Sequence, residues 1–244
     1  MPHRIRFLSL ALLSLLAATA FAPAQAQLVE GQDYRLLNPP RPTSSPGKIE
    51  VVEFFSYACP HCAKFYPLVS AWAAKLPKDV VFKRIAVSYG RPPWMNLART
   101  YYALEATGDL KKLDGALFHA IHDEGKNLFD EASIADWVGK QGGDAVKFAN
   151  AYTSFGINNQ TVQADQMAED YAIDGIPALA VNGRYVVLSP GQSPDEIASF
   201  RELLPRADKV IALARAAAAP APAPARPGRP GHAAADPAGA ANPK

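Results

Sequence analysis

Residues 48–69 of this 244-residue chain read KIEVVEFFSYACPHCAKFYPLV, and the prediction of its fold starts there. Residues 48–56 are a dense run of β-branched and aromatic side chains, which indicates a strand buried on both faces. Residues 63–76 carry apolar side chains at helical spacing, and Pro67 is expected to kink this helix. Residues 79–89 have the texture of a second strand. Strand, helix and strand in succession predict a βαβ unit, whose two strands lie parallel.

The rest of the folded part divides into a helical stretch and a second region of strands. Residues 92–170 contain periodic helical segments separated by Gly or short polar turns, without a strand signal among them. We therefore expect about five helices in succession, forming a helical subdomain inserted into the fold. Residues 177–189 predict two strands joined by Asn182 and Gly183, a strong β-hairpin signal. A helix over residues 193–216, whose first residues read SPDE, closes the fold.

The first 26 residues have the features of a secretory signal peptide. Arg4 and Arg6 precede an apolar run over residues 7–20, and small residues then alternate up to Ala26, where we expect cleavage. The run is shorter than the about 20 apolar residues of a bilayer span, although a retained N-terminal anchor is the alternative. Cleavage removes two of the 25 Lys and Arg residues and none of the 23 Asp and Glu residues, so the mature chain is neutral. This balance argues against binding to nucleic acid.

The other end of the chain has a different composition. Residues 216–244 consist mainly of Ala, Pro and Gly, with hardly any large apolar side chain. Such a segment buries too little surface to offset the entropy of ordering, so we expect a disordered tail. Residues 27–215 then form one domain, with the helical insertion at about 92–170.

Both cysteines of the chain, Cys59 and Cys62, fall within the opening stretch, and three kinds of site have to be weighed. A structural zinc site needs four ligands. Beyond the cysteines, the chain offers His119 and His122 on one predicted helix and His61 in a position poorly suited to chelation. A structural disulfide across so few residues constrains the unfolded chain only a little. A redox-active thiol pair explains the position of the cysteines best.

The position of Cys59 at the start of a predicted helix favours a reactive thiol. Unpaired N–H groups and the positive end of the helix dipole stabilise a thiolate there, and such surroundings can lower a thiol pKa from about 8.5 to roughly 3.5–7.5. Cys62 lies one turn further in and is expected to be the buried, resolving thiol. His61 can add positive charge near the Cys59 sulfur, although an incidental exposed imidazole is the alternative. A stabilised thiolate favours the reduced dithiol, so oxidation of client thiols is the expected direction.

The stretch EFFSYACPHCAKFYP, with Pro60 and His61 between the cysteines, resembles the active site of the DsbA-type periplasmic disulfide oxidoreductases. The stretch GIPALAVNGRYVV, residues 175–187, is similar to the cis-proline loop of that family and the hairpin after it, and the helical insertion matches as well. The resemblance covers residues 32–214, and the Ala/Pro-rich tail departs from it. It implies an α/β thioredoxin fold, in which a central mixed sheet is flanked by helices and carries an inserted all-helical subdomain.

The resemblance also implies roles for residues outside the CPHC motif. Ile176 and Pro177 would carry a cis peptide bond facing the first cysteine, with the Ile176 backbone pairing with an extended client chain. Glu53 would accept a proton near the second thiol, with Lys83 on the neighbouring strand as its partner. A buried carboxylate is costly unless it is paired or protonated, which agrees with such a role. The alternative is that Glu53 lies at a solvated end of its strand.

Together these observations predict a periplasmic thiol:disulfide interchange protein. It would donate the Cys59–Cys62 disulfide to newly secreted or unfolded cysteine-containing proteins through a mixed disulfide at Cys59, without a cofactor besides that disulfide. The resemblance implies reoxidation by a quinone-linked membrane partner of the DsbB type, and we expect a monomer. A reductase or isomerase of the same superfamily is one alternative, although the mature residues before the first strand are too few for the dimerisation domain of family isomerases. A non-catalytic chaperone that binds extended peptides is the other alternative.

Overall fold

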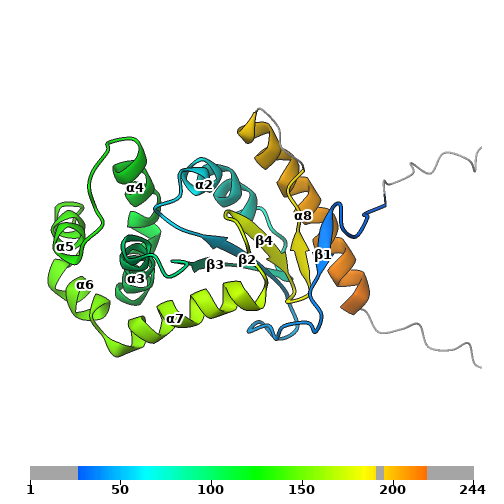
Figure 1. Cartoon of the computed structure of the whole chain (residues 1–244), viewed down its shortest axis with the longest axis horizontal. Helices are drawn as coiled ribbons and strands as arrows, with labels where there is room; N and C mark the ends of the chain where they lie inside the picture. The colour runs from blue at the N-terminus through cyan, green and yellow to red at the C-terminus, as the bar shows by residue number, and fades with distance from the viewer. Residues whose placement is uncertain (1–26, 191–194, 219–244) are drawn as a thin grey trace, which may run out of the picture.

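Strand β2 (Ile49–Phe55) is buried at every position and lies inside a five-stranded sheet in the computed structural model (Figure 1). The prediction of a strand buried on both faces is therefore confirmed. Strand β3 (Val80–Ala86) runs parallel to β2, and helix α2 (Pro60–Ala73) connects the two strands, as expected for a βαβ unit. Helix α2 continues through Pro67 as a single element.

The rest of the sheet is antiparallel, which makes the sheet mixed, as the resemblance implied. Strands β4 (Ala178–Val181) and β5 (Tyr185–Val187) form the predicted hairpin, and Asn182 and Gly183 at its turn have φ angles of 53° and 62°. Strand β4 also pairs with β2. Strand β1 (Tyr34–Leu36), which was not predicted, pairs with β5 and completes the order β1-β5-β4-β2-β3.

Five helices follow β3 along the continuously described stretch that leads to β4, as predicted. In Figure 1 the first four lie on the left of the sheet, and the last runs from there beneath it. Their apolar faces form a hydrophobic core that also contains both cysteines, so the insertion packs directly around the thiols. The helices are α3 (Pro92–Thr107), α4 (Leu110–His122), α5 (Glu131–Lys140), α6 (Ala145–Tyr152) and α7 (Phe155–Asp170).

Successive side chains along the strands point to opposite faces of the sheet and so divide its interior into two layers. Val51 and Leu179 point to the face covered by α2 and by α8 (Glu196–Ala218). Val52 and Phe54 point to the opposite face, where the C-terminal end of α7 and the residues after it pack. A polar side chain of β2 can therefore bind only partners that lie on the same face of the sheet.

The structure describes residues 27–190 and 195–218, and several predictions fall outside them. The expected signal peptide, the helix start at residues 193–194 and the tail beyond residue 218 all lie outside this part of the chain. Helix α8 extends to Ala218, so the prediction that the tail begins at residue 216 is wrong. Alanine is the best helix former, which explains why the helix continues into the alanine run. Within the described residues, no helix combines the length and the apolar character that a membrane span needs.

Replacing Gly183 with alanine tests the turn of the β4–β5 hairpin. Gly183 has a φ of +62°, and a Cβ atom there would lie 2.0 Å from the carbonyl oxygen of Arg41. We expect Gly183→Ala to lower the free energy of unfolding by about 2–3 kcal/mol, because steric overlap adds to the cost of a positive φ. Urea unfolding of the variant and the parent protein measures the change.

The matched control is Gly47→Ala. Gly47 has a φ of +73° and no atom within 4 Å of the added Cβ, so only the backbone cost of about 1 kcal/mol remains. Equal losses of stability in the two variants would show that the contact with Arg41 contributes nothing.

Candidate active site

Cys59 lies at the junction of β2 and α2, where it is the N-cap of the helix and Pro60 occupies the first helical turn. Proline is favoured there because its φ suits the helix and its missing N–H is not needed. Cys59 is 4% exposed, and its thiol donates a hydrogen bond to the carbonyl oxygen of Ile176 at 3.7 Å. Cys62, one turn later, is fully buried, and both residues are free thiols. The geometry is that of a reduced CPHC pair.

The two thiols have opposite tendencies to ionise. The hydrogen bond from the Cys62 thiol is the largest influence on Cys59. Burial opposes it, but the backbone N–H groups of Cys62 and His61 add to it, so the pKa of Cys59 falls to about 6. Burial raises the pKa of Cys62 well above its ordinary value, and neighbouring Cys59 and the charge of Glu53 raise it further. Above about pH 6 the Cys59 thiol therefore ionises and gives up its hydrogen bond to Ile176, which produces the nucleophilic thiolate, while Cys62 keeps its proton.

His61 is fixed by a partner from the far end of the chain. Its side chain is 59% exposed, and its Nδ1 atom forms a hydrogen bond with the carboxylate of Glu196 at the start of α8. Lys64 Nζ lies 2.9 Å from the other oxygen of the same carboxylate. Burial raises the pKa of Glu196, but the bonds from Lys64 and His61 outweigh it and lower the pKa below its ordinary value. His61 is therefore a tethered imidazole rather than an incidental exposed one.

The loop before β4 faces the thiols. The peptide bond between Ile176 and Pro177 is cis, as predicted, and the Ile176 carbonyl is the acceptor for the Cys59 thiol. A groove of about 900 Å³ opens beside this loop against α8 and β5. A largely apolar groove with a few polar groups suits an extended peptide of varied sequence. Its residues include Ile176, Pro177, Val186, Phe200 and Leu203 on the apolar side, and Arg35, His61 and Glu196 among the polar ones.

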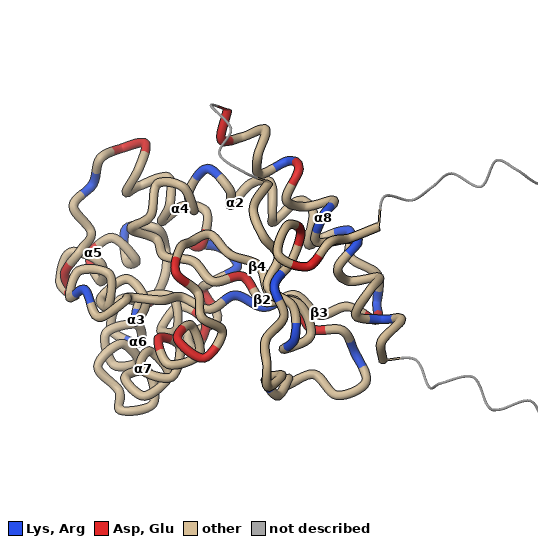
Figure 2. The backbone as a smooth tube through the Cα atoms, turned by 45° about the vertical axis from the view of Figure 1, so that its right-hand side comes forward, with Lys and Arg blue, Asp and Glu red and all other residues tan. Residues whose placement is uncertain are grey.

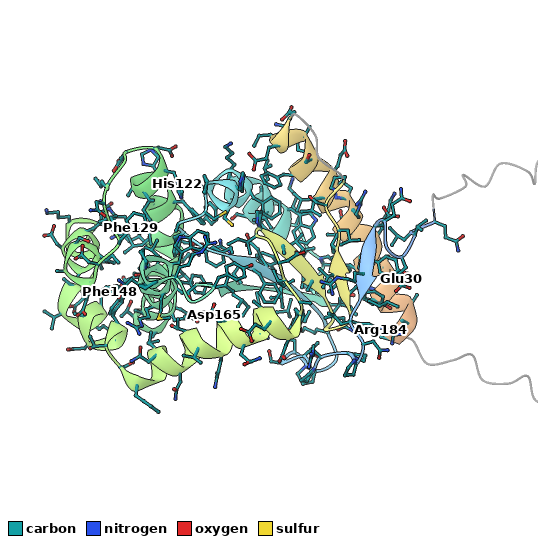
Figure 3. The ribbon with its side chains drawn as sticks, in the orientation of Figure 1. Glu30, His122, Phe129, Phe148, Asp165 and Arg184 are labelled. Carbon is teal, nitrogen blue, oxygen red and sulfur yellow. The ribbon has the colours of Figure 1, made fainter. Side chains whose placement is uncertain are left out.

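The loop after β3 provides a second surface near the thiols. Asp165 of α7 (labelled in Figure 3) accepts hydrogen bonds from the backbone N–H groups of Ser88 and Tyr89, at 2.7 and 3.2 Å, and from the Ser88 hydroxyl. Tyr89 has a φ of 49° and its ring centroid lies 6.4 Å from that of Trp94. Burial, followed by the charge of Cys62, raises the pKa of Tyr89 to about 12. Helix α7 therefore holds the backbone of Tyr89, whose ring packs against Trp94 of α3.

Glu53 is completely buried on the face of the sheet that packs against α2. Acidic and basic segments meet near β2 in Figure 2. The Nε atom of Arg84 on β3 lies 2.6 Å from Glu53 Oε2. The same guanidinium donates through Nη1 to both carboxylate oxygens of Asp114 on α4, at 2.7 and 2.9 Å. Burial raises the pKa of Glu53, Arg84 opposes this, and the charge of Asp114 adds to it. The alternative that Glu53 lies at a solvated strand end is therefore excluded.

The prediction that Lys83 is the partner of Glu53 is wrong. Lys83 Nζ lies 2.7 Å from Glu50 Oε2 instead. Strands β2 and β3 are in a register that sets Arg84 beside Glu53 and Lys83 beside Val52. Because neighbouring residues of a strand point to opposite faces, Lys83 and Glu53 lie on different sides of the sheet. The buried carboxylate has the expected kind of partner, one residue further along β3.

Helix α4 also holds the segment that leads into the thiols. His122 Nε2 (His122 is labelled in Figure 3) donates to the carbonyl oxygen of Tyr57 at 2.7 Å, and the Tyr57 hydroxyl donates to Asp114 at 2.6 Å. The ring centroid of Phe118 lies 4.7 Å from that of Tyr57. Asp114, Phe118 and His122 are spaced by four residues, which places them on one face of the helix. His119 points away from this contact, and among the described residues no three His, Cys, Asp or Glu side chains are grouped as a metal site would need.

Four residues of the site were not identified from the sequence. Arg84 carried a usable signal, since aligning the predicted starts of the two parallel strands, residues 48 and 79, pairs position 53 with position 84 rather than 83. Asp114, Tyr89 and Glu196 lie on elements far from the CPHC motif in the chain, and only the packing of those elements brings them to it.

The sequence is similar to those of known proteins over most of its length. Residues 91–200 match the family model described as a DSBA-like thioredoxin domain. The thiol:disulfide interchange protein DsbA of Bordetella parapertussis is 45% identical over 208 residues, which cover 84% of this chain and 95% of that protein. DsbA of Pseudomonas aeruginosa is 36% identical over 203 residues, which cover 83% of this chain and 96% of that protein.

Solved structures agree with this relationship. The crystal structure of Pseudomonas aeruginosa DsbA has a TM-score of 0.71 at 37% identity and covers 78% of this chain and 96% of its own. That of the oxidoreductase DsbA from Xylella fastidiosa has a TM-score of 0.69 at 32% identity and covers 78% of this chain and 98% of its own. Since relatives at 36–45% identity cover most of this chain and nearly all of their own length, the chain belongs to the DsbA family of thiol:disulfide interchange proteins, which are disulfide oxidoreductases with a thioredoxin fold.

Proposed function

We propose that the chain oxidises pairs of thiols in newly secreted or unfolded proteins by donating its Cys59–Cys62 disulfide. The observation that carries this proposal is the contrast between the thiols, since the pKa of Cys59 is about 6 and that of Cys62 is raised well above its ordinary value. Each pKa unit by which a thiolate is stabilised is worth about 1.4 kcal/mol, which corresponds to about 30 mV. A stabilised Cys59 thiolate favours the dithiol, so the disulfide is readily given away.

The reaction proceeds through two exchanges. A client thiolate attacks the Cys59 sulfur, a client–Cys59 bond forms, and the Cys59–Cys62 bond breaks with Cys62 leaving. A second client thiolate then attacks the client sulfur of this mixed disulfide, and Cys59 leaves as a thiolate. The client loses two electrons and gains a disulfide, while the CPHC pair gains the two electrons and becomes a dithiol. The low pKa of Cys59 makes it a good leaving group in the second exchange.

Glu53 is proposed to exchange the proton of Cys62. When Cys62 leaves in the first exchange it needs a proton, because its buried surroundings disfavour a thiolate. Glu53 is a buried acid whose raised pKa lets it hold a proton at higher pH than an ordinary carboxyl group. Its Oε1 atom has no hydrogen-bond partner among the described residues and is therefore available for this transfer. In the reverse direction, the same oxygen accepts the proton as Cys62 attacks.

The groove beside the cis-proline loop is proposed to hold the client. The Ile176 carbonyl is adjacent to the Cys59 sulfur, so a client backbone that pairs with Ile176 would bring its own cysteine to that sulfur. Backbone pairing provides affinity without reading sequence, and the apolar wall adds contacts that most unfolded segments can satisfy. This arrangement supports a broad range of clients.

The proposal includes a compartment and a partner. The basic start, apolar run and small residues before Gln27 support secretion into the periplasm. After each turnover the dithiol must pass two electrons on, and we propose a quinone-linked membrane oxidase of the DsbB type as the acceptor. We also propose that the chain acts as a monomer.

The first test of this function is the pH dependence of alkylation of the reduced protein, together with its reduction potential against glutathione. We expect the rate of reaction with iodoacetamide to rise with pH to a plateau with a midpoint at about 6, because only the Cys59 thiolate reacts. The potential should lie above that of the glutathione couple. Cys62→Ala should move the midpoint upward, since it removes the hydrogen bond that is the largest influence on Cys59.

A midpoint near that of a free thiol, with a potential below that of glutathione, would instead assign the chain to the reductases. Full biological activity of Cys59→Ala would point to a peptide-binding chaperone.

A second test replaces the proposed proton carrier. Glu53→Gln should slow the steps in which Cys62 leaves or attacks by roughly 10-fold or more, because the buried thiol loses its acid–base partner. Stopped-flow fluorescence during oxidation and reduction measures these steps. Glu50→Gln is the matched control, since Glu50 is another buried carboxylate of β2 but bonds to Lys83. Equal rates for Glu53→Gln and the parent protein would remove Glu53 from the mechanism.

A further inference from the structure

Arg84 is shared by two carboxylates from different parts of the fold. Its Nε atom binds Glu53 on β2, and its Nη1 atom binds both oxygens of Asp114 on α4 of the helical insertion. The guanidinium is nearly buried and stands 3.7 Å over the ring of Phe55. Asp114 is fixed in turn by the Tyr57 hydroxyl at 2.6 Å. One buried cation is therefore divided between a residue beside the thiols and a residue outside the thioredoxin unit.

We propose that Asp114 is a positioning residue for the exchange reaction, because it holds Arg84 by two hydrogen bonds and so limits how firmly Arg84 binds the proton-carrying carboxylate Glu53. The inference rests on the role proposed for Glu53 above. It makes the helical insertion part of the acid–base machinery of Cys62, although no atom of α4 has to touch a client or a sulfur.

The physical argument starts from the hydrogen bonds. An arginine that bound Glu53 alone could use its fork to hold both carboxylate oxygens, which is the strongest form of this pair. Here Glu53 receives one bond, to Oε2, while Asp114 receives two, both from Nη1. Arg84 Nη2 and Glu53 Oε1 are both left without a partner among the described residues, so the bonds from Nη1 to Asp114 hold the guanidinium out of the two-bond pairing with Glu53. The negative charge of Asp114 also offsets part of the positive charge that Glu53 experiences. Both effects favour the protonated form of Glu53.

Other titratable groups near Glu53 do not replace this effect. Besides Glu53, Arg84 and Asp114, the titratable groups that interact with one or more of these three are a thiol and three phenols, which keep their protons at neutral pH because burial raises each of their pKa values. Asp114 is therefore the nearby group that supplies a second negative charge. The thiol belongs to α2, and the phenols come from the end of β2, from α2 and from α3: Cys62, Tyr57, Tyr66 and Tyr101.

The experiment follows the reaction of the reduced protein with glutathione disulfide, from about pH 4 to about pH 9, so that carboxyl and thiol titrations are both covered. In the first step the Cys59 thiolate attacks glutathione disulfide, forming a Cys59–glutathione bond and releasing one glutathione. In the second step Cys62 attacks the Cys59 sulfur, the Cys59–Cys62 bond forms, the second glutathione leaves, and the Cys62 proton passes to Glu53. Acid quenching and mass spectrometry separate the two rates.

The rate of the second step should fall at acid pH, where Glu53 is already protonated and cannot accept the Cys62 proton. Asp114→Asn should move the midpoint of this fall to lower pH by about one unit or more, because Glu53 loses the neighbouring negative charge and binds Arg84 more firmly. The pH profile of the first step should stay unchanged. Glu53→Gln should remove this fall in rate at acid pH. Adding Asp114→Asn to Glu53→Gln should then leave the pH profile of the second step unchanged. Asp136→Asn is the matched control, since Asp136 is an exposed acid of the insertion that pairs with Lys140.

Two outcomes would overturn the inference. One is an unmoved midpoint in Asp114→Asn. The other is a decrease in the second-step rate that Asp114→Asn causes equally in the parent protein and in Glu53→Gln, which would mean a merely structural role. A fall in rate at acid pH that survives Glu53→Gln would instead overturn the role proposed for Glu53 itself. If Asp114→Asn does not fold, Asp114→Ser removes the same charge with a smaller side chain, and the same shift is expected of it.

Discussion

The buried ion pair between Glu53 and Arg84 constrains the rest of the structure. The effective cost of moving a charge from water into a protein interior is several kcal/mol, and only a close partner offsets it. Glu53 is fully buried and Arg84 nearly so, with apolar and aromatic side chains around them. Neither residue can occupy its place without the other. The register of β2 against β3, which sets these residues side by side, is therefore fixed by electrostatics as well as by the apolar pattern.

The same pair explains why the helical insertion packs where it does. Arg84 has more donors than Glu53 can use, and Asp114 accepts two of its hydrogen bonds. Asp114 lies on the face of α4 that also carries Phe118 and His122, and that face contacts Tyr57 through a ring contact and two hydrogen bonds. A shift of α4 would therefore leave a buried charge incompletely paired and release the backbone just before the thiols. Packing, charge and the geometry of the thiol loop favour the same position of the helix.

Sequence reasoning found what depends on local pattern and missed what depends on packing. The apolar run of β2, the Asn-Gly turn and the helical periodicities are local signals, and each predicted element is present. Strand β1 spans only Tyr34–Leu36, too short for an alternating pattern to stand out. The choice of Lys83 over Arg84 came from the family resemblance and took no account of the β2–β3 register, which pairs Glu53 with Arg84. Glu196 joins His61 across 135 residues of chain, a contact that no local pattern encodes.

Two carboxylates act near the thiols, and they differ in their exposure to solvent. Glu196 binds His61 beside Cys59, whereas Glu53 acts on Cys62. The side chain of Glu196 is 28% exposed and its partner His61 is 59% exposed, so water and salt weaken the influence of these charges. Glu53 is completely buried, and at a given distance its charge acts several times more strongly than it would in water. The pKa of Cys59 therefore depends mainly on its hydrogen bonds with the Cys62 thiol and with the backbone N–H groups of Cys62 and His61. Cys62, which has to keep its proton until it attacks, is kept protonated mainly by burial, and the charge of Glu53, which solvent does not reach, adds to this effect.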